Sequence, residues 1–349
     1  MPLHWIEISK KNLLNNVASI KSKLQKNTKF MAMIKANAYG HGLDIVSKVL
    51  QNQVDYFGVN TIQEAQTIRQ LGINTPILIT GPIDIGDINL VLKNNVDICA
   101  HSIEYLQSLV KYPIRIHLKI NTGMNRLGIN PQELKTAITI IKNSKIIPTG
   151  IYTHFHSADS KLMSTKKQLT KFKECVTVYK SIFPNSMAHC ANTSATLTHP
   201  DSHLDMVRVG LGLYGLWPSK FVEDKSKIKL VPILKWVAKI IQHRMLTQGE
   251  SVGYSATYIA KNNMNTAIIP VGYSDGLDRR LSSKTHFIGR VAMNFSAIDI
   301  KKSKGVINDD GYFEIIGPTF TADKIAELIG TINYEVTTRL NNNIRRILA

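Results

Sequence analysis

Cysteine is scarce in this chain of 349 residues, which has three, and they lie far apart at Cys99, Cys175 and Cys190. An odd, dispersed set does not suit a disulfide framework or a zinc site, so we expect reduced thiols and a cytoplasmic location. The chain has no uninterrupted apolar run near the roughly 18 residues that suggest a membrane span. Its start, MPLHWIEISKKNLLNN, has no apolar core followed by a small-residue cleavage site. These absences predict neither a membrane partner nor a secretory signal.

Acidic residues are also few, 25 against 43 Lys and Arg, which gives a formal net charge of +18. Such a charge can mark a nucleic-acid-binding protein. Here the basic residues are scattered and no nucleic-acid-binding motif accompanies them, so we predict no nucleic-acid partner. The diffuse positive field should instead attract small anions. A hydrophobic content of 44% and a charged content of 19% are typical of a globular protein and exclude a disordered chain.

Strand-like and helix-like segments alternate over the first two thirds of the chain. Helical spacing of apolar residues occurs at 8–24, 61–72 and 131–144, while 193–204 has the weakest helical pattern. The strand-like runs number eight: 30–36, 55–60, 76–81, 97–102, 114–121, 148–155, 187–192 and 205–215. This pattern predicts an α/β fold, a (β/α)₈ barrel over residues 1–224. In such barrels the site residues follow the carboxyl ends of the strands.

The pattern changes near residue 225. Strand-like segments follow one another there without long helices between them. Only residues 321–330 have a helical pattern, with Thr321 as a plausible N-cap. Residues 225–349 therefore predict a second, mainly β domain.

The segment MIKANAYGHG (33–42) carries the first chemical signal, because Lys35 follows the first barrel strand inside an apolar stretch. Burial disfavours an ammonium group, and a lysine with a lowered pKa suits Schiff-base chemistry with a carbonyl group. A lysine that merely extends from a strand toward water is the alternative reading of this position taken alone.

This segment closely resembles the cofactor-lysine motif of alanine racemases, which use pyridoxal 5′-phosphate (PLP). Further segments resemble that family in its order: LKINTGMNRLG (118–128), YTHF (152–155), HCANTSAT (189–196), RVGLGLYG (208–215), VGYSATY (252–258), VGYSDG (271–276), GRVAMN (289–294) and YEV (334–336). The resemblance implies a PLP-binding barrel followed by a β domain. It also implies a homodimer that racemises a small amino acid, alanine, to supply D-alanine for peptidoglycan.

The resemblance assigns the two proton-transfer bases to Lys35 and Tyr254. Racemisation needs a proton donor on each face of a planar carbanion, because one base alone returns the proton to the face it left. A tyrosine with an ordinary pKa near 10 needs a neighbour that favours the phenolate. The resemblance names Arg126 as that neighbour, also in contact with substrate, and His154 as part of the same network and a cofactor contact. It further implies that the tyrosine reaches in from the second subunit.

Further cofactor contacts follow from the resemblance. Arg208 corresponds to the arginine that faces the ring nitrogen of PLP; it does not readily surrender its proton, so the ring nitrogen stays unprotonated. Met293 corresponds to a residue of the substrate pocket, with an ordinary core methionine as the alternative. The remaining predicted cofactor contacts are Tyr39, Asn192, Thr193, Gly210 and Tyr273.

Two other patterns predict little. The stretch GLGLYG (210–215) matches a dinucleotide fingerprint, but Trp217 and Pro218 follow it where a helix would be required. His154 and His156 have no acidic or cysteine companions at ligand spacing, so we predict no metal site.

Some positions depart from the family pattern. Asn294 stands where the family usually has Asp, and Asn342 where many relatives have a phosphate-contacting Tyr. Lys119 occupies a position that is carbamylated in some relatives, and its state here is open. These departures leave open a racemase of serine or of broad specificity. A non-catalytic PLP carrier would lack the β domain with Tyr254, and a decarboxylase would need an acidic partner where Arg208 stands.

Overall fold

The computed structural model describes residues 2–160 and 163–349. Contacts between Cα atoms divide the chain into two compact units. We call Leu13–Ala38 with Val46–Val231 the barrel unit. We call Met1–Asn12, Tyr39–Ile45 and Pro232–Ala349 together the β unit. No helix among the described residues combines the length and apolar character needed to cross a membrane.

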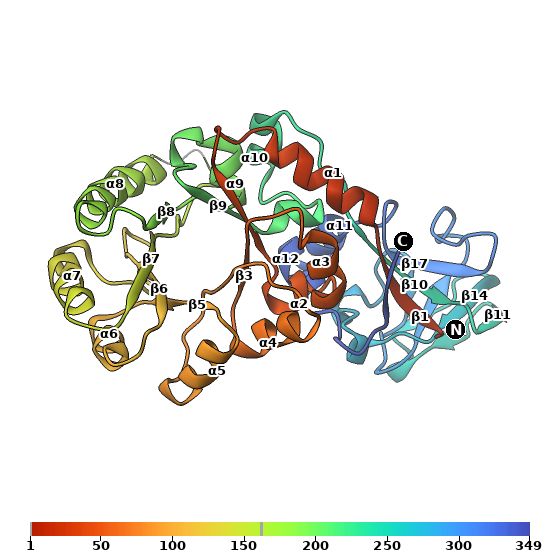
Figure 1. The fold of residues 1–349 in the computed structure, drawn as a ribbon. Helices are drawn as coiled ribbons and strands as arrows, with labels where there is room; N and C mark the ends of the chain where they lie inside the picture. The colour runs from red at the N-terminus through yellow and green to blue at the C-terminus, as the bar shows by residue number, and fades with distance from the viewer. Residues whose placement is uncertain (1, 161–162) are drawn as a thin grey trace. The chain divides into compact units, whose positions relative to one another are not determined.

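The centre of the barrel unit is a closed barrel of parallel strands, shown in Figure 1. The eight predicted strands all occur, in sequence order around the barrel, and the predicted fold class is confirmed. They are β2 (Lys29–Met33), β3 (Tyr56–Val59), β4 (Ile77–Ile79), β5 (Asp97–Ala100), β6 (Arg115–Lys119), β7 (Ile147–Tyr152), β8 (Met187–His189) and β9 (Met206–Val209). Strands β4, β5 and β9 are buried at every position, as expected where helices cover the outside of a parallel sheet.

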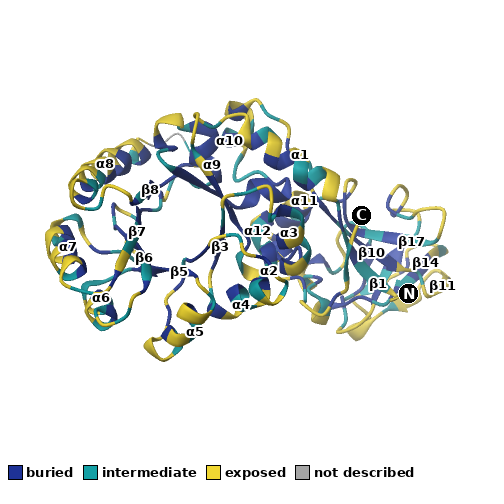
Figure 2. Ribbon diagram, viewed as in Figure 1, coloured by how far each residue is buried: buried dark blue, intermediate teal, exposed yellow. Residues whose placement is uncertain are grey.

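Helices connect the barrel strands, and in most of them buried and exposed positions alternate, as Figure 2 shows, because the apolar face packs inward; α9 is buried throughout. The connecting helices are α2 (Lys35–Tyr39), α3 (Leu43–Leu50), α4 (Ile62–Gln70), α5 (Ile88–Lys93), α6 (Ile103–Leu109), α7 (Leu134–Lys142), α8 (Ser164–Ile182) and α9 (Thr193–Thr198). Helix α1 (Lys10–Lys21) precedes the first barrel strand, and α10 (Lys220–Ser226) follows the last one. The weak pattern at 193–204 becomes the single short helix α9 and a 3₁₀ turn, Pro200–Ser202.

The β unit contains two four-stranded sheets and a two-stranded hairpin. One sheet has the order β17 (Tyr312–Ile316), β10 (Leu234–Lys239), β1 (His4–Ile8), β18 (Arg346–Leu348). The other has the order β11 (Gln242–Leu246), β14 (Met264–Ile269), β16 (Ser296–Asp299), β15 (Phe287–Ile288). The hairpin pairs β12 (Ser251–Val252) with β13 (Tyr258–Ile259).

Two helices belong to the β unit. Helix α11 (Ala322–Ile329) lies where it was predicted, and the Thr321 side chain accepts a hydrogen bond from the Lys324 backbone N–H at 3.2 Å as its N-cap. Helix α12 (Asn333–Thr338) was not predicted, since six residues are too few to show a helical period.

The division into units differs from the predicted boundary at the start of the chain. The sequence assigns residues 1–224 to the barrel and 225–349 to the β domain. In the structure β1 is a strand of the β unit, because it pairs antiparallel with β10 and parallel with β18. The residue pattern of a five-residue strand can indicate which side chains are buried, but it does not identify the strand with which it pairs. This pairing therefore could not be predicted from the pattern.

Candidate active site

Lys35 follows β2, at the carboxyl end of the first barrel strand, where barrel enzymes place their site residues. The next residues, Ala36–Ala38, all have φ of 52°, a left-handed conformation that non-glycine residues rarely adopt. The backbone N–H of Ala36 donates to Oε1 of Glu64 at 2.6 Å, which holds the start of this turn. Strained backbone of this kind persists where the surroundings fix it, and it often marks a functional site.

Positive charges gather around Lys35. Burial lowers the pKa of Lys35, and the charge of Arg126 lowers it further, followed by a smaller effect of Arg208. Glu64 is the one acidic group that acts on Lys35 in the opposite direction. Burial also lowers the pKa of Lys119, with additional repulsion from Arg208, Arg126 and Lys35. A cluster of cations with a single carboxylate favours an anionic ligand, which would relieve the repulsion.

Arg208 is buried on β9 and is held by four acceptors. Its Nη1 lies 3.0 Å from Nδ1 of His189, and its Nη2 donates to the carbonyl oxygens of Thr153 at 2.7 Å and Cys190 at 3.4 Å. Nη2 also lies 3.3 Å from Nδ1 of His154. A planar guanidinium held on both terminal nitrogens has a fixed orientation.

His154 is neutral at physiological pH. Burial lowers its pKa to about 3, and the charges of Arg208, Lys119 and Arg126 contribute in that order. Its Nδ1 can therefore accept a hydrogen bond from Arg208. The hydrogen-bond partner of His154 is thus Arg208, and the charge of Arg126 also acts on it; a shared network of His154 and Arg126 with Tyr254 stays a prediction.

A group of hydrogen-bonding atoms lies where α9 begins. Thr193 Oγ1 accepts the backbone N–H of Gly210 at 3.0 Å and that of Gly212 at 3.5 Å. Asn192 is the N-cap of α9, and its side chain accepts the N–H of Ala195 at 3.0 Å. The structure thus brings together three of the predicted cofactor contacts, Asn192, Thr193 and Gly210. They lie after the carboxyl ends of β8 and β9.

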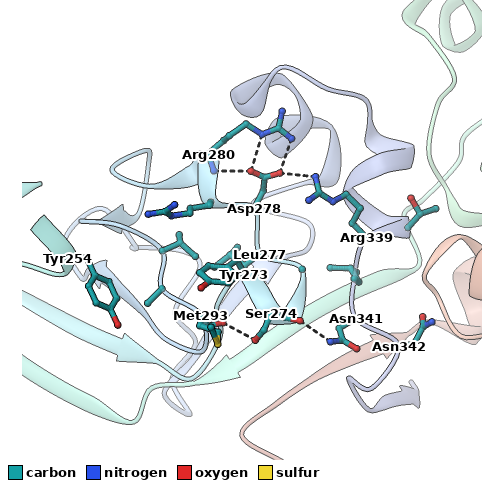
Figure 3. A pocket seen from close by; sticks show the side chains of 16 residues that line it. Tyr254, Tyr273, Ser274, Leu277, Asp278, Arg280, Met293, Arg339, Asn341 and Asn342 are labelled. Carbon is teal, nitrogen blue, oxygen red and sulfur yellow. Dashed lines mark hydrogen bonds and ion pairs between the residues drawn. The ribbon is translucent and has the colours of Figure 1, made fainter.

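The β unit contains a pocket of about 940 Å³. Three predicted site residues line it, namely Tyr254, Tyr273 and Met293, as Figure 3 shows. The other lining residues are Ser274, Gly276, Leu277, Asp278, Arg279, Arg280, Val291, Ala292, Thr338, Arg339, Leu340, Asn341 and Asn342. Asn342, one of the departures named from the sequence, is therefore a residue of this pocket.

The loops that carry Tyr273 and Met293 are tied together. A Cβ atom on Gly272 would overlap the carbonyl oxygen of Met293, so this close approach requires glycine. Ser274 Oγ donates to the same carbonyl oxygen at 2.8 Å, and Asn294 Nδ2 donates to Ser274 Oγ at 3.0 Å. Asn294 thus serves as an amide donor within this loop pair.

One wall of the pocket is an ion-pair network. Asp278 contacts Arg280 Nη2 at 2.8 Å and Arg339 Nη1 at 3.3 Å, and Arg339 also pairs with Glu335 at 2.9 Å. The hydrogen bond from Arg280 lowers the pKa of Asp278 below its ordinary value, in spite of partial burial. The dashed lines in Figure 3 show that Asp278 is shared by both arginines.

Tyr39 does not join the pocket lining. It packs beside Tyr334, with 6.2 Å between ring centroids, and burial followed by Tyr334 raises its pKa. The predicted residues thus fall into two groups. The barrel unit holds Lys35, Arg126, His154, Asn192, Thr193, Arg208 and Gly210, and the β unit holds Tyr39, Tyr254, Tyr273 and Met293.

Sequence reasoning missed two residues that support the site. Glu64, which holds the turn after Lys35, also closes a capping box with Thr61 at the start of α4. The spacing Thr-x-x-Glu before an apolar helix was a visible signal for it. His189, the buried partner of Arg208, gave no such signal, because a single histidine in a strand is usually a core residue.

Two family models match the chain. The model described as "Alanine racemase, N-terminal domain" matches residues 8–218, and "Alanine racemase, C-terminal domain" matches residues 233–348. Among curated relatives, an alanine racemase of Leptospira interrogans is 36% identical over 376 residues, covering 99% of this chain and 95% of that protein. An alanine racemase of Listeria monocytogenes is 35% identical, covering 98% of this chain and 96% of that protein.

Solved structures give the same answer. Alanine racemase of Clostridium difficile 630 superposes with a TM-score of 0.93 at 30% identity, covering 100% of this chain and 96% of that one. A Bacillus anthracis alanine racemase with bound L-Ala-P gives a TM-score of 0.92 at 29% identity, covering 100% of this chain and 95% of that one.

Proposed function

Because the chain belongs to the alanine racemase family, we propose that it interconverts L-alanine and D-alanine with PLP in a site shared by two subunits. The chain is an amino-acid racemase, which is an isomerase. The observation that carries the proposal is the cluster of Lys35, Arg126, Arg208 and neutral His154 in the barrel unit.

The barrel unit offers the groups that PLP requires. The aldehyde needs an amine, which Lys35 supplies, with a pKa lowered by burial. The phosphate needs hydrogen-bond donors, and the Thr193 hydroxyl with the Gly210 backbone lies beside a helix start. When bound, PLP would withdraw electrons from the substrate carbon that bears the amine and so make its proton acidic. We infer that Lys35, Thr193 and Gly210 hold the cofactor, with Asn192 supporting the loop.

Arg208 would tune the electron demand at this site. A guanidinium donates hydrogen bonds and does not surrender its proton, so a ring nitrogen beside it stays unprotonated. An unprotonated ring withdraws electrons less strongly. We infer that Arg208 keeps charge build-up on the substrate brief, which favours return of the proton over side reactions.

Lys35 and Tyr254 would act on opposite faces of the substrate. A single base restores the configuration from which it took the proton, so inversion requires a second group. The phenol of Tyr254 supplies it, and Arg126 supplies positive charge that favours a phenolate and a bound carboxylate. Met293, which lines the pocket with Tyr254, would limit the size of the substrate side chain.

Tyr254 is 69% exposed, and a proton-transfer base needs a site from which water is excluded. Ile259, Met293 and Phe295 of the β unit are also more than half exposed. We infer that a second copy of the chain covers this apolar surface, and that the Tyr254 side chain completes the barrel site of the partner.

We further infer a cytoplasmic location and a role in supplying D-alanine for peptidoglycan. The three cysteines are all free and buried, which fits a reducing compartment.

The test is formation of D-alanine from L-alanine by the purified chain, with and without added PLP. We expect turnover that depends on PLP and exceeds that with L-serine in a panel of L-amino acids. Turnover independent of PLP would refute the cofactor, and faster turnover of serine would refute the substrate.

A further inference from the structure

A line of four hydrogen-bonding side chains crosses the inside of the barrel. Arg208 Nη1 lies 3.0 Å from His189 Nδ1, and His189 Nε2 lies 2.7 Å from His117 Nδ1. His117 Nε2 lies 3.2 Å from Asp97 Oδ2. The four residues come from β9, β8, β6 and β5, whose order around the barrel is seen in Figure 1. All four are buried, with at most 4% of any residue exposed.

The chemistry of Arg208 fixes the direction of every bond in this line. A guanidinium donates hydrogen bonds and has no acceptor, so His189 Nδ1 must be the unprotonated nitrogen of a neutral ring. His189 then carries its proton on Nε2 and donates to His117 Nδ1. By the same logic His117 is neutral, with its proton on Nε2, and donates to Asp97. The line is consistent if its last member is an acceptor, which an ionised carboxylate always is.

Glycine on the strand between the histidines makes the line possible. Gly150 of β7 lies beside His117 in the register of β6 and β7, between the strands that carry the two rings. A Cβ atom there would overlap the His117 ring at Nδ1 and Cε1. The absent side chain lets His117 reach across β7 to His189.

Aromatic rings hold both histidines. Tyr152 stacks on His189 with 5.0 Å between centroids and 2° between planes. Tyr56 meets His117 edge to face at 6.1 Å and 70°. Rings held in this way cannot flip freely to exchange their nitrogen atoms, so the tautomers are the remaining freedom.

Asp97 is held ionised at the far end. Arg115 Nε donates to its Oδ1 at 2.5 Å, and Thr149 and Tyr56 hydroxyls donate to its Oδ2, each at 3.3 Å. Burial alone would raise the pKa of Asp97, but the hydrogen bond from His117, together with the charge and hydrogen bond of Arg115, brings it below the ordinary value. The negative end of the line thus opposes the positive end at Arg208.

We propose that Asp97 is a positioning residue for Arg208: through His117 and His189 it fixes the unprotonated nitrogen that orients the guanidinium. The inference deepens the proposed function, since it rests on Arg208 facing the ring nitrogen of PLP. Asp97 touches neither substrate nor cofactor and acts through the two neutral rings.

The variant Asp97→Asn tests the direction of the line. Because Arg115 only donates hydrogen bonds, the amide oxygen of the new side chain must take the place of Oδ1. Its NH₂ group then takes the place of Oδ2, opposite His117 Nε2. His117 must accept there and carry its proton on Nδ1. That proton faces His189 Nε2, and His189 then carries a proton on Nδ1 opposite a donor of Arg208. The substitution therefore breaks the line while hardly changing its shape.

Neutron diffraction from deuterated crystals of the wild-type chain without PLP reads the protons directly. We expect deuterium on Nε2 of both His117 and His189 and none on either Nδ1. Deuterium on Nδ1 of either ring in the wild type would overturn the proposal, and this measurement does not depend on whether any variant folds. In Asp97→Asn we expect deuterium on Nδ1 of His117, whereas an unchanged pattern would also overturn it. Thr149→Val, which removes one donor to the same carboxylate, should leave both tautomers as in the wild type.

Activity with PLP supplies the second measurement. We expect kcat of Asp97→Asn to fall about 10- to 100-fold with little change in KM, the size typical of lost orienting partners. Gly150→Ala displaces the His117 ring without altering a charge and should reduce kcat in the same way. Asp87→Asn, in the 3₁₀ turn before α5 that has no buried residue, should retain wild-type kcat. Equal kcat for wild type and Asp97→Asn would refute the role of Asp97.

The two proposals fail in different ways. A wild-type chain that does not racemise alanine would refute the proposed function, yet the proton positions in the protein without PLP would still be measurable. A chain that racemises alanine but carries the opposite tautomers would refute the inference about Asp97 alone.

Discussion

At the scale of single residues, the structure explains why Lys35 is suited to its proposed task. Its amine is flanked by Arg126 and Arg208, and burial adds to their effect, so its pKa is lowered from the ordinary value. A larger fraction of the amine is then neutral and nucleophilic at a given pH. The strained turn after it holds the side chain's starting point in place.

Lys35→Ala should abolish the absorbance band of cofactor attached to the protein. Racemisation should fall by at least about 10²–10⁴-fold, the usual contribution of a proton-transferring side chain. Ultraviolet–visible spectra with PLP and a D-alanine assay measure both effects. Lys29→Ala, at the exposed start of the same strand, is the control and should keep both signals. An intact band in Lys35→Ala would disprove the role of Lys35.

Tyr254→Phe should separate the two bases. We expect racemisation to fall by about 10²–10⁴-fold while the cofactor absorbance of Lys35 persists. Exchange of the substrate's α-proton with deuterated water should continue for one enantiomer and be lost for the other, since Lys35 serves a single face. Proton NMR of each enantiomer in deuterated buffer measures this. Exchange of both enantiomers at the wild-type rate would contradict the two-base arrangement.

At the scale of elements, the connection between α4 and the Lys35 turn is the point most open to test. Glu64 accepts the backbone N–H of Asn60 at 2.7 Å and of Thr61 at 3.2 Å, besides that of Ala36. The Glu64 carboxylate thus caps the start of α4 and also restrains the strained turn after Lys35.

Glu64→Ala should lower the free energy of unfolding by about 1–2 kcal/mol, as for the loss of a helix cap with charge-assisted hydrogen bonds. It should also lower the pKa of Lys35 further, since the Glu64 charge raises it. Urea unfolding measures the first effect, with Gln63→Ala at the neighbouring exposed position as the control. Equal stability of the Glu64→Ala and Gln63→Ala variants would show that the cap is dispensable.

The sequence predicted the barrel well, because buried parallel strands are short continuous apolar runs and the helices between them have their own period. Thr321 and α11 were predicted from a cap followed by an amphipathic pattern. The pairing of β1 with β18 could not be predicted, because hydrogen bonding between the two ends of a chain leaves no local pattern. The contact of Tyr39 with a phosphate group stays a prediction; its packing beside Tyr334 could not be predicted, because only the tertiary fold brings the two rings together. The line from Asp97 to Arg208 depends on Gly150. A glycine in a strand can indicate a close approach of another group, but the sequence does not show which side chain makes that approach.

At the scale of the whole molecule, the proposed sharing of sites between subunits makes a quantitative prediction. Lys35→Ala and Tyr254→Phe should each be inactive alone. In a mixed dimer, one site combines the wild-type Lys35 of one subunit with the wild-type Tyr254 of the other. The isolated mixed dimer should therefore have about half of wild-type activity, and an unseparated random mixture about a quarter.

Co-expression of the two variants with different affinity tags, followed by isolation of the doubly tagged species, provides this measurement. A control pairing of Lys35→Ala with itself should remain inactive. A mixed dimer that is as inactive as its parents would mean that Lys35 and Tyr254 act within one subunit.

The histidines predict that the whole protein is sensitive to acid. Burial is the main cause that lowers the pKa of seven of the eleven, and it lowers that of His154 to about 3. The unfolded chain binds protons at these groups near pH 6.5 and the folded chain binds them at lower pH, so their contribution to stability is present above pH 6.5 and is lost as the pH falls; for His154 the loss extends toward pH 3.

Urea unfolding of the chain without PLP should show a free energy of unfolding that decreases from pH 7 to pH 5, by up to about 1.4 kcal/mol per pH unit for each of the deeply buried His154 and His189. His154→Gln should decrease less steeply, by about one bound proton. A midpoint that is constant over this range would contradict the neutral state of the buried rings.

The pairing of β1 with β18 has a consequence for synthesis of the chain. Ile6 pairs with Arg346 and Ile8 with Leu348, so a strand made early is completed by one made much later. All eight barrel strands lie between β1 and β18 in the sequence, so the ribosome synthesises the whole barrel before this pairing can form. The barrel can therefore fold while β1 still has an open edge, and that edge is a surface that chaperones could bind during synthesis.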